Sequence, residues 1–82
     1  MTAMFTGDIR TAATTAAANG WGTGIEYNGQ LWFRRDADAL LVRYDGPTGE
    51  ITGVVRKLDD EAVTLVRRGD ADKLATLVGQ LA

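Results

Sequence analysis

Aromatic, aliphatic and arginine side chains alternate in the middle of the chain, and they are the residues best suited to chemistry. Trp32 is followed by Arg34, and further along Leu41 is followed by Arg43 at the same spacing. An indole offers a flat apolar surface, and a guanidinium offers five hydrogen-bond donors in a fixed plane. Both groups are enriched where proteins bind partners. The pattern therefore favours recognition.

Catalysis and metal binding find little support in the composition. The chain contains no cysteine, histidine or serine, which removes thiolate and imidazole ligands, serine nucleophiles and the usual general base. Its carboxylates cluster where turns and helix caps are predicted, and Asp36 with Asp38 does not continue into a calcium loop. We expect no catalytic residue, no metal and no cofactor, and thus a protein that is not an enzyme.

The segment with glycines at positions 20, 22 and 24 is similar in composition to a phosphate-binding loop. Such a loop follows a strand and opens a helix, so that the phosphate lies on the helix N-terminus. Here the predicted helix comes before the glycines and a strand comes after them. We therefore expect a structural connection in which Trp21 packs against the core.

Length and charge narrow the choice of function. The 82 residues form a single domain over positions 1–82, with a net charge of −2 that argues against a strongly basic nucleic-acid binder. No segment reads as a secretory signal or a membrane span, so we expect a cytoplasmic protein with no membrane partner. A domain this small buries only about 60–65% of its unfolded surface, which favours oligomers.

Two helices are predicted at the ends of the chain. Residues 6–19 place Ile9, Ala12 and Ala16 on one face, with Thr6 or Asp8 as the cap, and residues 70–81 begin at the capping residue Asp70. The apolar stripe of the first helix is nearly all alanine, so this helix must pack closely against its neighbour. The second stripe consists of Leu74, Leu77, Val78 and Leu81.

Short segments rich in β-formers lie between the helices. Strands are predicted near 23–27, 30–35, 39–45 and 50–58, with turns at Asn28-Gly29, 36–39 and 46–49. Residues 62–67 fit either a fifth strand or a short helix, and their β-branched residues favour the strand. The sequence thus predicts an α+β fold: an N-terminal helix, a four- or five-stranded antiparallel meander and a C-terminal helix.

The turn lengths predict which side chains share a face of the sheet. Tyr27 is expected to pair with Gln30, Arg34 with Leu41, and Tyr44 with Ile51. One face is then almost wholly apolar and must be covered by helices; it collects Leu31, Phe33, Leu40, Val42, Tyr44, Ile51, Gly53 and Val55. The opposite face mixes aromatics, aliphatics and arginines; it collects Ile25, Tyr27, Trp32, Arg34, Leu41, Arg43, Thr52, Val54 and Arg56.

This mixed face has three interpretations. A helix could cover part of it with arginine stems along the apolar residues, a second copy of the chain could bind it, or nucleic-acid bases could stack on Trp32 and Tyr27. We expect a small protein-interaction module, a homodimer, with a nucleic-acid-binding module as the alternative. Arginine outnumbers lysine seven to two, a bias typical of GC-rich genomes, and favours a phage or mobile-element accessory protein that modulates a host protein. The predicted partner-binding residues are Tyr27, Trp32, Arg34, Leu41, Arg43 and Arg56.

The order of the predicted elements resembles that of the double-stranded-RNA-binding-like folds, which run α-β-β-β-α and include small toxin modules. The likeness is one of topology. The catalytic histidine that such toxins carry is absent here, and so is a lysine-rich start to the helix. The resemblance therefore implies no activity for this chain.

Overall fold

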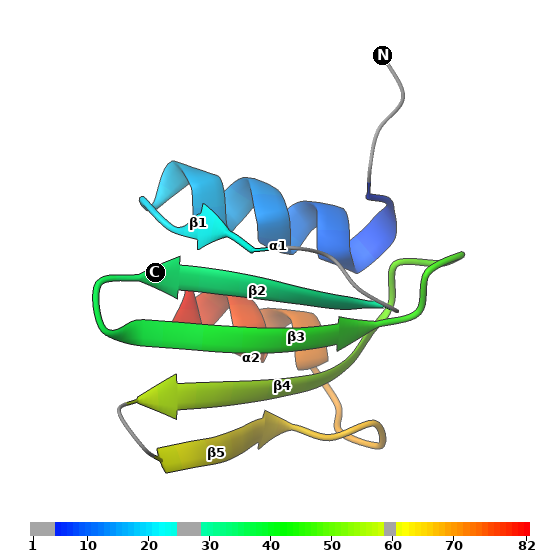
Figure 1. The fold of residues 1–82 in the computed structure, drawn as a ribbon. Coiled ribbons are helices and arrows are strands. Elements are labelled where there is room, and N and C mark those ends of the chain that lie inside the picture. The colour runs from blue at the N-terminus through cyan, green and yellow to red at the C-terminus, as the bar shows by residue number, and fades with distance from the viewer. Residues whose placement is uncertain (1–4, 25–28, 59–60) are drawn as a thin grey trace.

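A computed structural model shows a meander of five strands between two helices (Figure 1). The structure describes residues 5–24, 29–58 and 61–82. The strands neighbour one another in chain order, and every pair is antiparallel, which confirms the predicted α+β fold. In order, the elements are α1 (Gly7–Ala18), β1 (Gly22–Thr23), β2 (Gln30–Arg35), β3 (Asp38–Tyr44), β4 (Ile51–Leu58), β5 (Glu61–Val66) and α2 (Lys73–Gln80).

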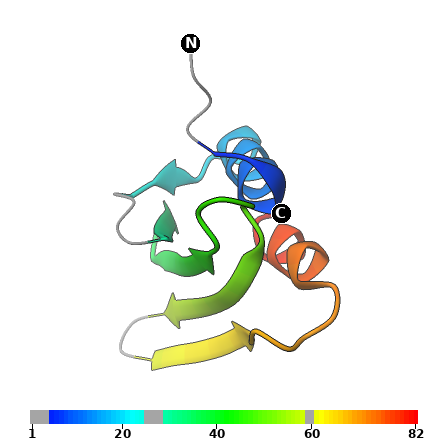
Figure 2. The same ribbon diagram turned by 90° about the vertical axis from the view of Figure 1, so that its right-hand side faces the viewer.

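Both helices lie on the same side of the sheet (Figure 2). The alanine stripe of α1 is buried, so its backbone comes close to α2 and β1, as the sequence predicts. The core between the layers also includes Trp21 and Leu81. Its other members come from both helices and from the sheet and are Ile9, Ala12, Ala16, Leu31, Phe33, Leu40, Val42, Tyr44, Ile51, Val54, Val66 and Leu77.

Residues 61–66 form a strand, which resolves the ambiguity left by the sequence. Helix α2 starts at Lys73 and not at residue 70 as predicted. The reason is local, because the carboxylate of Asp70 accepts a hydrogen bond from the backbone N–H of Arg67 at 2.9 Å and so closes the preceding turn. Asp72 takes the position before the helix, with a left-handed φ of 54°.

The predicted registers of β2 with both of its neighbours are wrong. The β2–β3 hairpin has a two-residue turn at Asp36 and Ala37, so that Arg34 pairs with Ala39 and not with Leu41. Asp36 adopts a φ of 55°, a conformation that aspartate tolerates in turns. A shift of two residues leaves each side chain on its predicted face. On the other side of β2, Gly22 pairs with Arg34, one residue from the predicted register.

The turn after β3 supplies the cap for helix α1. No side chain caps this helix, although Thr6 occupies the N-cap position and was a predicted cap. Instead, the carbonyl oxygen of Gly49 accepts a hydrogen bond from the N–H of Ile9 at 2.9 Å. Gly49 has a φ of +74°, and a Cβ at this position would collide with the carbonyl of Thr6. Glycine is thus required where the turn meets the helix.

Trp21 joins the ends of both helices to the sheet. Its indole is 5% exposed, and its Nε1 donates a hydrogen bond to the carbonyl of Leu81 at 2.9 Å. The Asn19 side chain donates to the same carbonyl at 3.0 Å. On β2, the guanidinium of Arg35 lies 4.5 Å from the centroid of the Trp21 ring. The prediction that Trp21 packs against the core is confirmed.

We predict that Gly49→Ala lowers the free energy of unfolding by at least 1–2 kcal/mol, roughly the cost of a left-handed φ for alanine. The matched control is Gly46→Ala in the same turn, because nothing lies within 4 Å of a Cβ built there. Urea unfolding followed by circular dichroism measures both. Equal stabilities for the two variants would contradict the role of Gly49.

Candidate partner-binding face

A β-bulge in β4 decides which side chains face away from the helices. Val42 pairs with Val54 and Arg43 with Gly53, but Tyr44 pairs with Ile51. Thr52 is therefore an extra residue, and an extra residue reverses the in-out alternation beyond it. The prediction that Gly53 and Val55 belong to the covered face is wrong: Val54 is fully buried in the core, and Val55 lies on the other side.

Arg56 lies on the helix side for the same reason, so its predicted place beside Trp32 is also wrong. Its Nη1 donates a hydrogen bond to Oε1 of Gln80 in α2 at 2.8 Å. Its Nη2 lies 3.0 Å from Oδ1 of Asp38 in an ion pair. Arg56 thus connects β3 and β4 to α2, and the next residue, Lys57, takes its place on the uncovered side.

We call this uncovered side of the sheet the open face. Side chains that lie opposite one another on neighbouring strands form three rows on it, and the rows run across the strands. The middle row is apolar, with Trp32 opposite Leu41 and Leu41 opposite Val55; it ends at Thr64. The row nearer the β2–β3 turn consists of Arg34, Ala39, Lys57 and Ala62, and the row on the other side consists of Gln30, Arg43 and Gly53.

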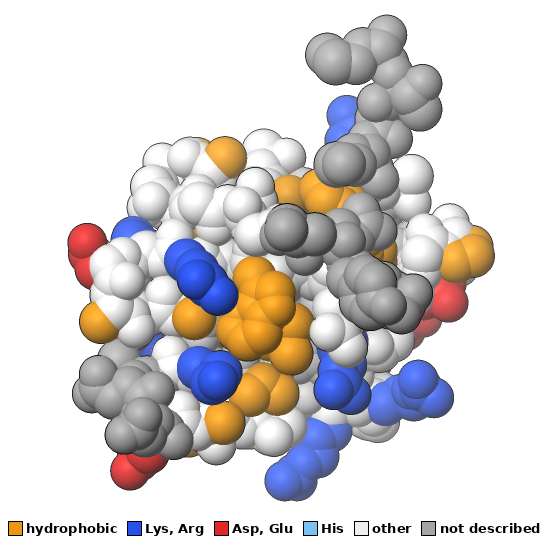
Figure 3. All heavy atoms as spheres, in the orientation of Figure 1, with side chains coloured by type: hydrophobic (Ala, Val, Ile, Leu, Met, Phe, Trp, Pro, Cys, Tyr) orange, Lys and Arg blue, Asp and Glu red, His pale blue; other side chains and the backbone are white. Residues whose placement is uncertain are grey.

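Among the strand residues that the structure describes, charge on the open face is of one sign. Arg34, Arg43 and Lys57 lie on it, and none of the strand residues that the structure describes there is acidic. Figure 3 looks at this side of the sheet: cationic side chains surround an apolar centre, and acidic atoms appear only near the margin. Since the whole chain has a net charge of −2, the acidic groups must lie mainly elsewhere. The open face is thus a local positive patch on an acidic protein.

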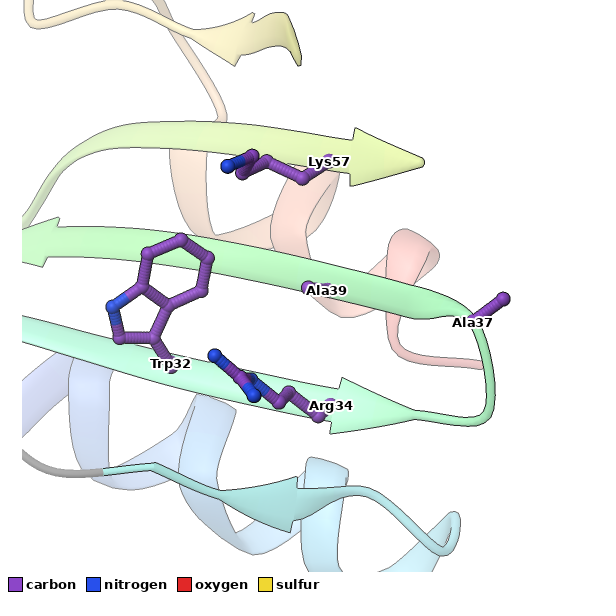
Figure 4. Close-up of a pocket in the computed structure, with 5 residues that line it drawn as sticks. All are labelled: Trp32, Arg34, Ala37, Ala39 and Lys57. Carbon is purple, nitrogen blue, oxygen red and sulfur yellow. The ribbon is translucent and has the colours of Figure 1, made fainter. Parts of the chain in front are cut away.

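A shallow hollow of about 330 Å³ lies between the middle row and the row of Arg34. Arg34 and Lys57 both lean toward the indole of Trp32 from either side of Ala39 (Figure 4). The Arg34 guanidinium is 5.6 Å from the centroid of the Trp32 ring, within range of a cation–π contact. Small side chains at Ala37 and Ala39 leave the space between the cations open to a ligand group.

The structure brings together four of the predicted partner-binding residues: Trp32, Arg34, Leu41 and Arg43. Tyr27, together with Ile25, lies outside the described residues. Sequence reasoning missed Val55 and Lys57, because it continued the β4 register through Thr52. The available signal was Gly53, since a glycine inside a strand often marks a bulge.

Other kinds of site find no support in the parts of the chain that the structure describes. No three acidic side chains lie close enough there to hold a metal ion. Neither described helix is long and apolar enough to cross a membrane. Comparisons with models of protein families, with curated proteins and with solved structures found no match to this chain. The proposal for its function therefore depends on the open face.

The two tryptophans are predicted to differ in their access to solvent, because Trp21 is buried and Trp32 lines the hollow. Trp21→Phe leaves Trp32 as the only indole, and Trp32→Phe leaves Trp21. Acrylamide should quench the fluorescence of the Trp21→Phe protein several times more strongly than that of the Trp32→Phe protein. Equal quenching in folded variants would mean that Trp32 is covered.

Neighbouring cations on β4 are predicted to have separate roles. Arg56→Ala removes contacts to Asp38 and Gln80 and should lower the free energy of unfolding by about 0.5–1 kcal/mol, since this ion pair is partly solvated. Lys57→Ala should change it by less than about 0.5 kcal/mol, as is usual for surface positions. Thermal unfolding compares the two. A larger loss for Lys57→Ala would contradict the assigned faces.

Proposed function

We propose that this protein is a non-catalytic module whose open face binds an acidic surface of another protein. The observation that carries the proposal is the apolar row Trp32–Leu41–Val55, flanked by cations on both sides and free of carboxylates among its described residues. An apolar centre within a polar rim is the usual anatomy of a protein interface, and tryptophan and arginine are its commonest energetic anchors. The uniform sign of the rim selects partners of opposite charge.

A nucleic-acid platform is the second candidate, and the composition of the apolar row argues against it. Platforms for single strands bind successive bases by stacking them on aromatic rings. Of the three side chains in the row, Trp32 alone is aromatic. Leu41 and Val55 bury apolar area but provide no π-face for a base. The three cations would still attract phosphate, so the experiment below includes an oligonucleotide.

A second copy of the chain fits the open face poorly. A symmetric dimer brings the same patch of both chains together, so the cations of one copy would lie close to the cations of the other. Like charges across an interface are unfavourable. The partner is therefore a different protein. Homodimerisation, a phage accessory role and a cytoplasmic location stay predictions from length and composition.

The test is affinity capture with the wild-type protein, followed by purification of the captured protein and titration. Trp32→Ala removes the largest apolar side chain of the row and should weaken the Kd by about thirtyfold, the usual scale for a tryptophan anchor. Lys57→Glu should weaken it by about tenfold and make binding less dependent on salt. Sedimentation of the free protein reports its oligomeric state in the same buffers.

The matched control for Lys57→Glu is Arg10→Glu, which makes the same change of charge at an exposed position on α1. It should leave the Kd within about twofold, as expected for a charge outside the interface. If the captured protein bound Trp32→Ala and Lys57→Glu as tightly as wild type, the open face would not be the binding site. A labelled oligonucleotide bound through Trp32 and Lys57, with no protein captured, would favour the second candidate.

A further inference from the structure

We propose that the partner docks an acidic amphipathic α-helix on the open face, with the helix axis across the strands and along the apolar row. This inference rests on the proposed function, because it specifies which segment of the protein partner occupies the face. It depends on three properties of the described residues: the length of the apolar row, the spacing of the cationic rows beside it, and the paired backbone and small side chains around it.

The length of the apolar row matches the repeat of a helix. Neighbouring strands lie about 4.8 Å apart, so Trp32 on β2 and Val55 on β4 are separated by about 10 Å, with Leu41 between them. Residues i and i+7 on one face of an α-helix are about 10.5 Å apart along its axis. Apolar side chains at i, i+3 or i+4, and i+7 would therefore meet the three members of the row in turn.

The cationic rows lie where the flanks of such a helix would be. Side chains two residues apart on one strand are separated by about 6.7 Å, so Arg43 lies on one side of the apolar row and Arg34 and Lys57 lie on the other. A helix with its side chains is about 10–12 Å wide, so acidic residues on both flanks would reach these cations. The hollow between Arg34 and Lys57 would take one carboxylate.

Backbone hydrogen bonding excludes an extended segment from this position. The N–H and C=O groups of β2, β3 and β4 pair within the sheet, so the open face offers side chains and few backbone partners. A strand laid on it would leave its own backbone groups without partners where it displaces water. A helix satisfies its backbone internally and can lie on a flat surface. Ala39, Gly53 and Ala62 place no bulky side chain beside the row, so a helix can come close to the sheet.

The experiment uses the folded Trp21→Phe protein, in which Trp32 is the only indole, and two synthetic peptides without tryptophan. Both have the same leucine, glutamate and alanine composition; one places leucine at i, i+3, i+4 and i+7, and the other alternates leucine with glutamate. The helical peptide should bind saturably, shift the Trp32 emission to the blue, and lose about tenfold in affinity with Lys57→Glu. The alternating peptide should bind at least tenfold more weakly.

The position of the helix axis along the apolar row is tested by disulfide crosslinking. The chain has no cysteine of its own, so a single thiol can be introduced at a chosen position. Thr64→Cys places a thiol at the β5 end of the apolar row, and Ala75→Cys places one at an exposed position on α2. A cysteine at the end of the helical peptide that lies over β5 should form a disulfide with Thr64→Cys and not with Ala75→Cys. Equal crosslinking at both sites would overturn the proposed orientation.

The other outcomes separate the inference from the proposed function. Tighter binding of the alternating peptide, weakened by Lys57→Glu, would overturn the helix and leave an acidic protein partner as the proposal. Binding of a thymidine oligonucleotide that Lys57→Glu weakens, with neither peptide bound, would overturn both proposals. Binding of none of the three probes would overturn the helix, while the captured protein of the preceding section decides the proposed function.

Discussion

The extra residue in β4 is the constraint on which the two sides of this sheet depend. Thr52 has no partner in the pairing of β3 with β4, so every side chain beyond it lies on the opposite face from an uninterrupted strand. Val54 then enters the core, and Lys57 joins the open face. Without the bulge, Arg56 would lie opposite Ala39 on the open face, and Lys57 would point toward the helices. The bulge therefore sets both the packing of the core and the charge pattern of the exposed sheet.

Charge is distributed differently on the two sides of the sheet. On the helix side, Arg56 is paired with Asp38 and bound to Gln80, so its charge is neutralised locally. The cations of the open face, by contrast, have no acidic neighbour among the described strand residues of that face. Ion pairs at a surface add little stability, so the folded state does not require the open-face cations. In our proposal, the open-face cations serve to bind the partner.

The fold could be predicted because its signals are local. The alanine stripe of α1, the turn around Pro47 and the β-branched residues before Val66 each indicate one element, and the structure has each of them. Trp32 and Arg34 could be assigned to one face since residues two apart on a strand share a face whatever the register. Lys57 could not, because a bulge changes the alternation without changing the composition of the strand. Tertiary contacts also decided the cap of α1, where the carbonyl of Gly49 replaces a side chain.

The contact between Trp21 and Leu81 has a consequence for biosynthesis. The indole near the start of the sheet donates its hydrogen bond to a carbonyl 60 positions later, and Leu81 itself is fully buried. A ribosome makes the chain from the N-terminus, so α1 and the first strands emerge before the residues that complete their core. Apolar surface on α1 and β4 must therefore stay uncovered until α2 has been made. For such a nascent chain, emergence of the last turn of α2 from the ribosome is the step at which the native core can close.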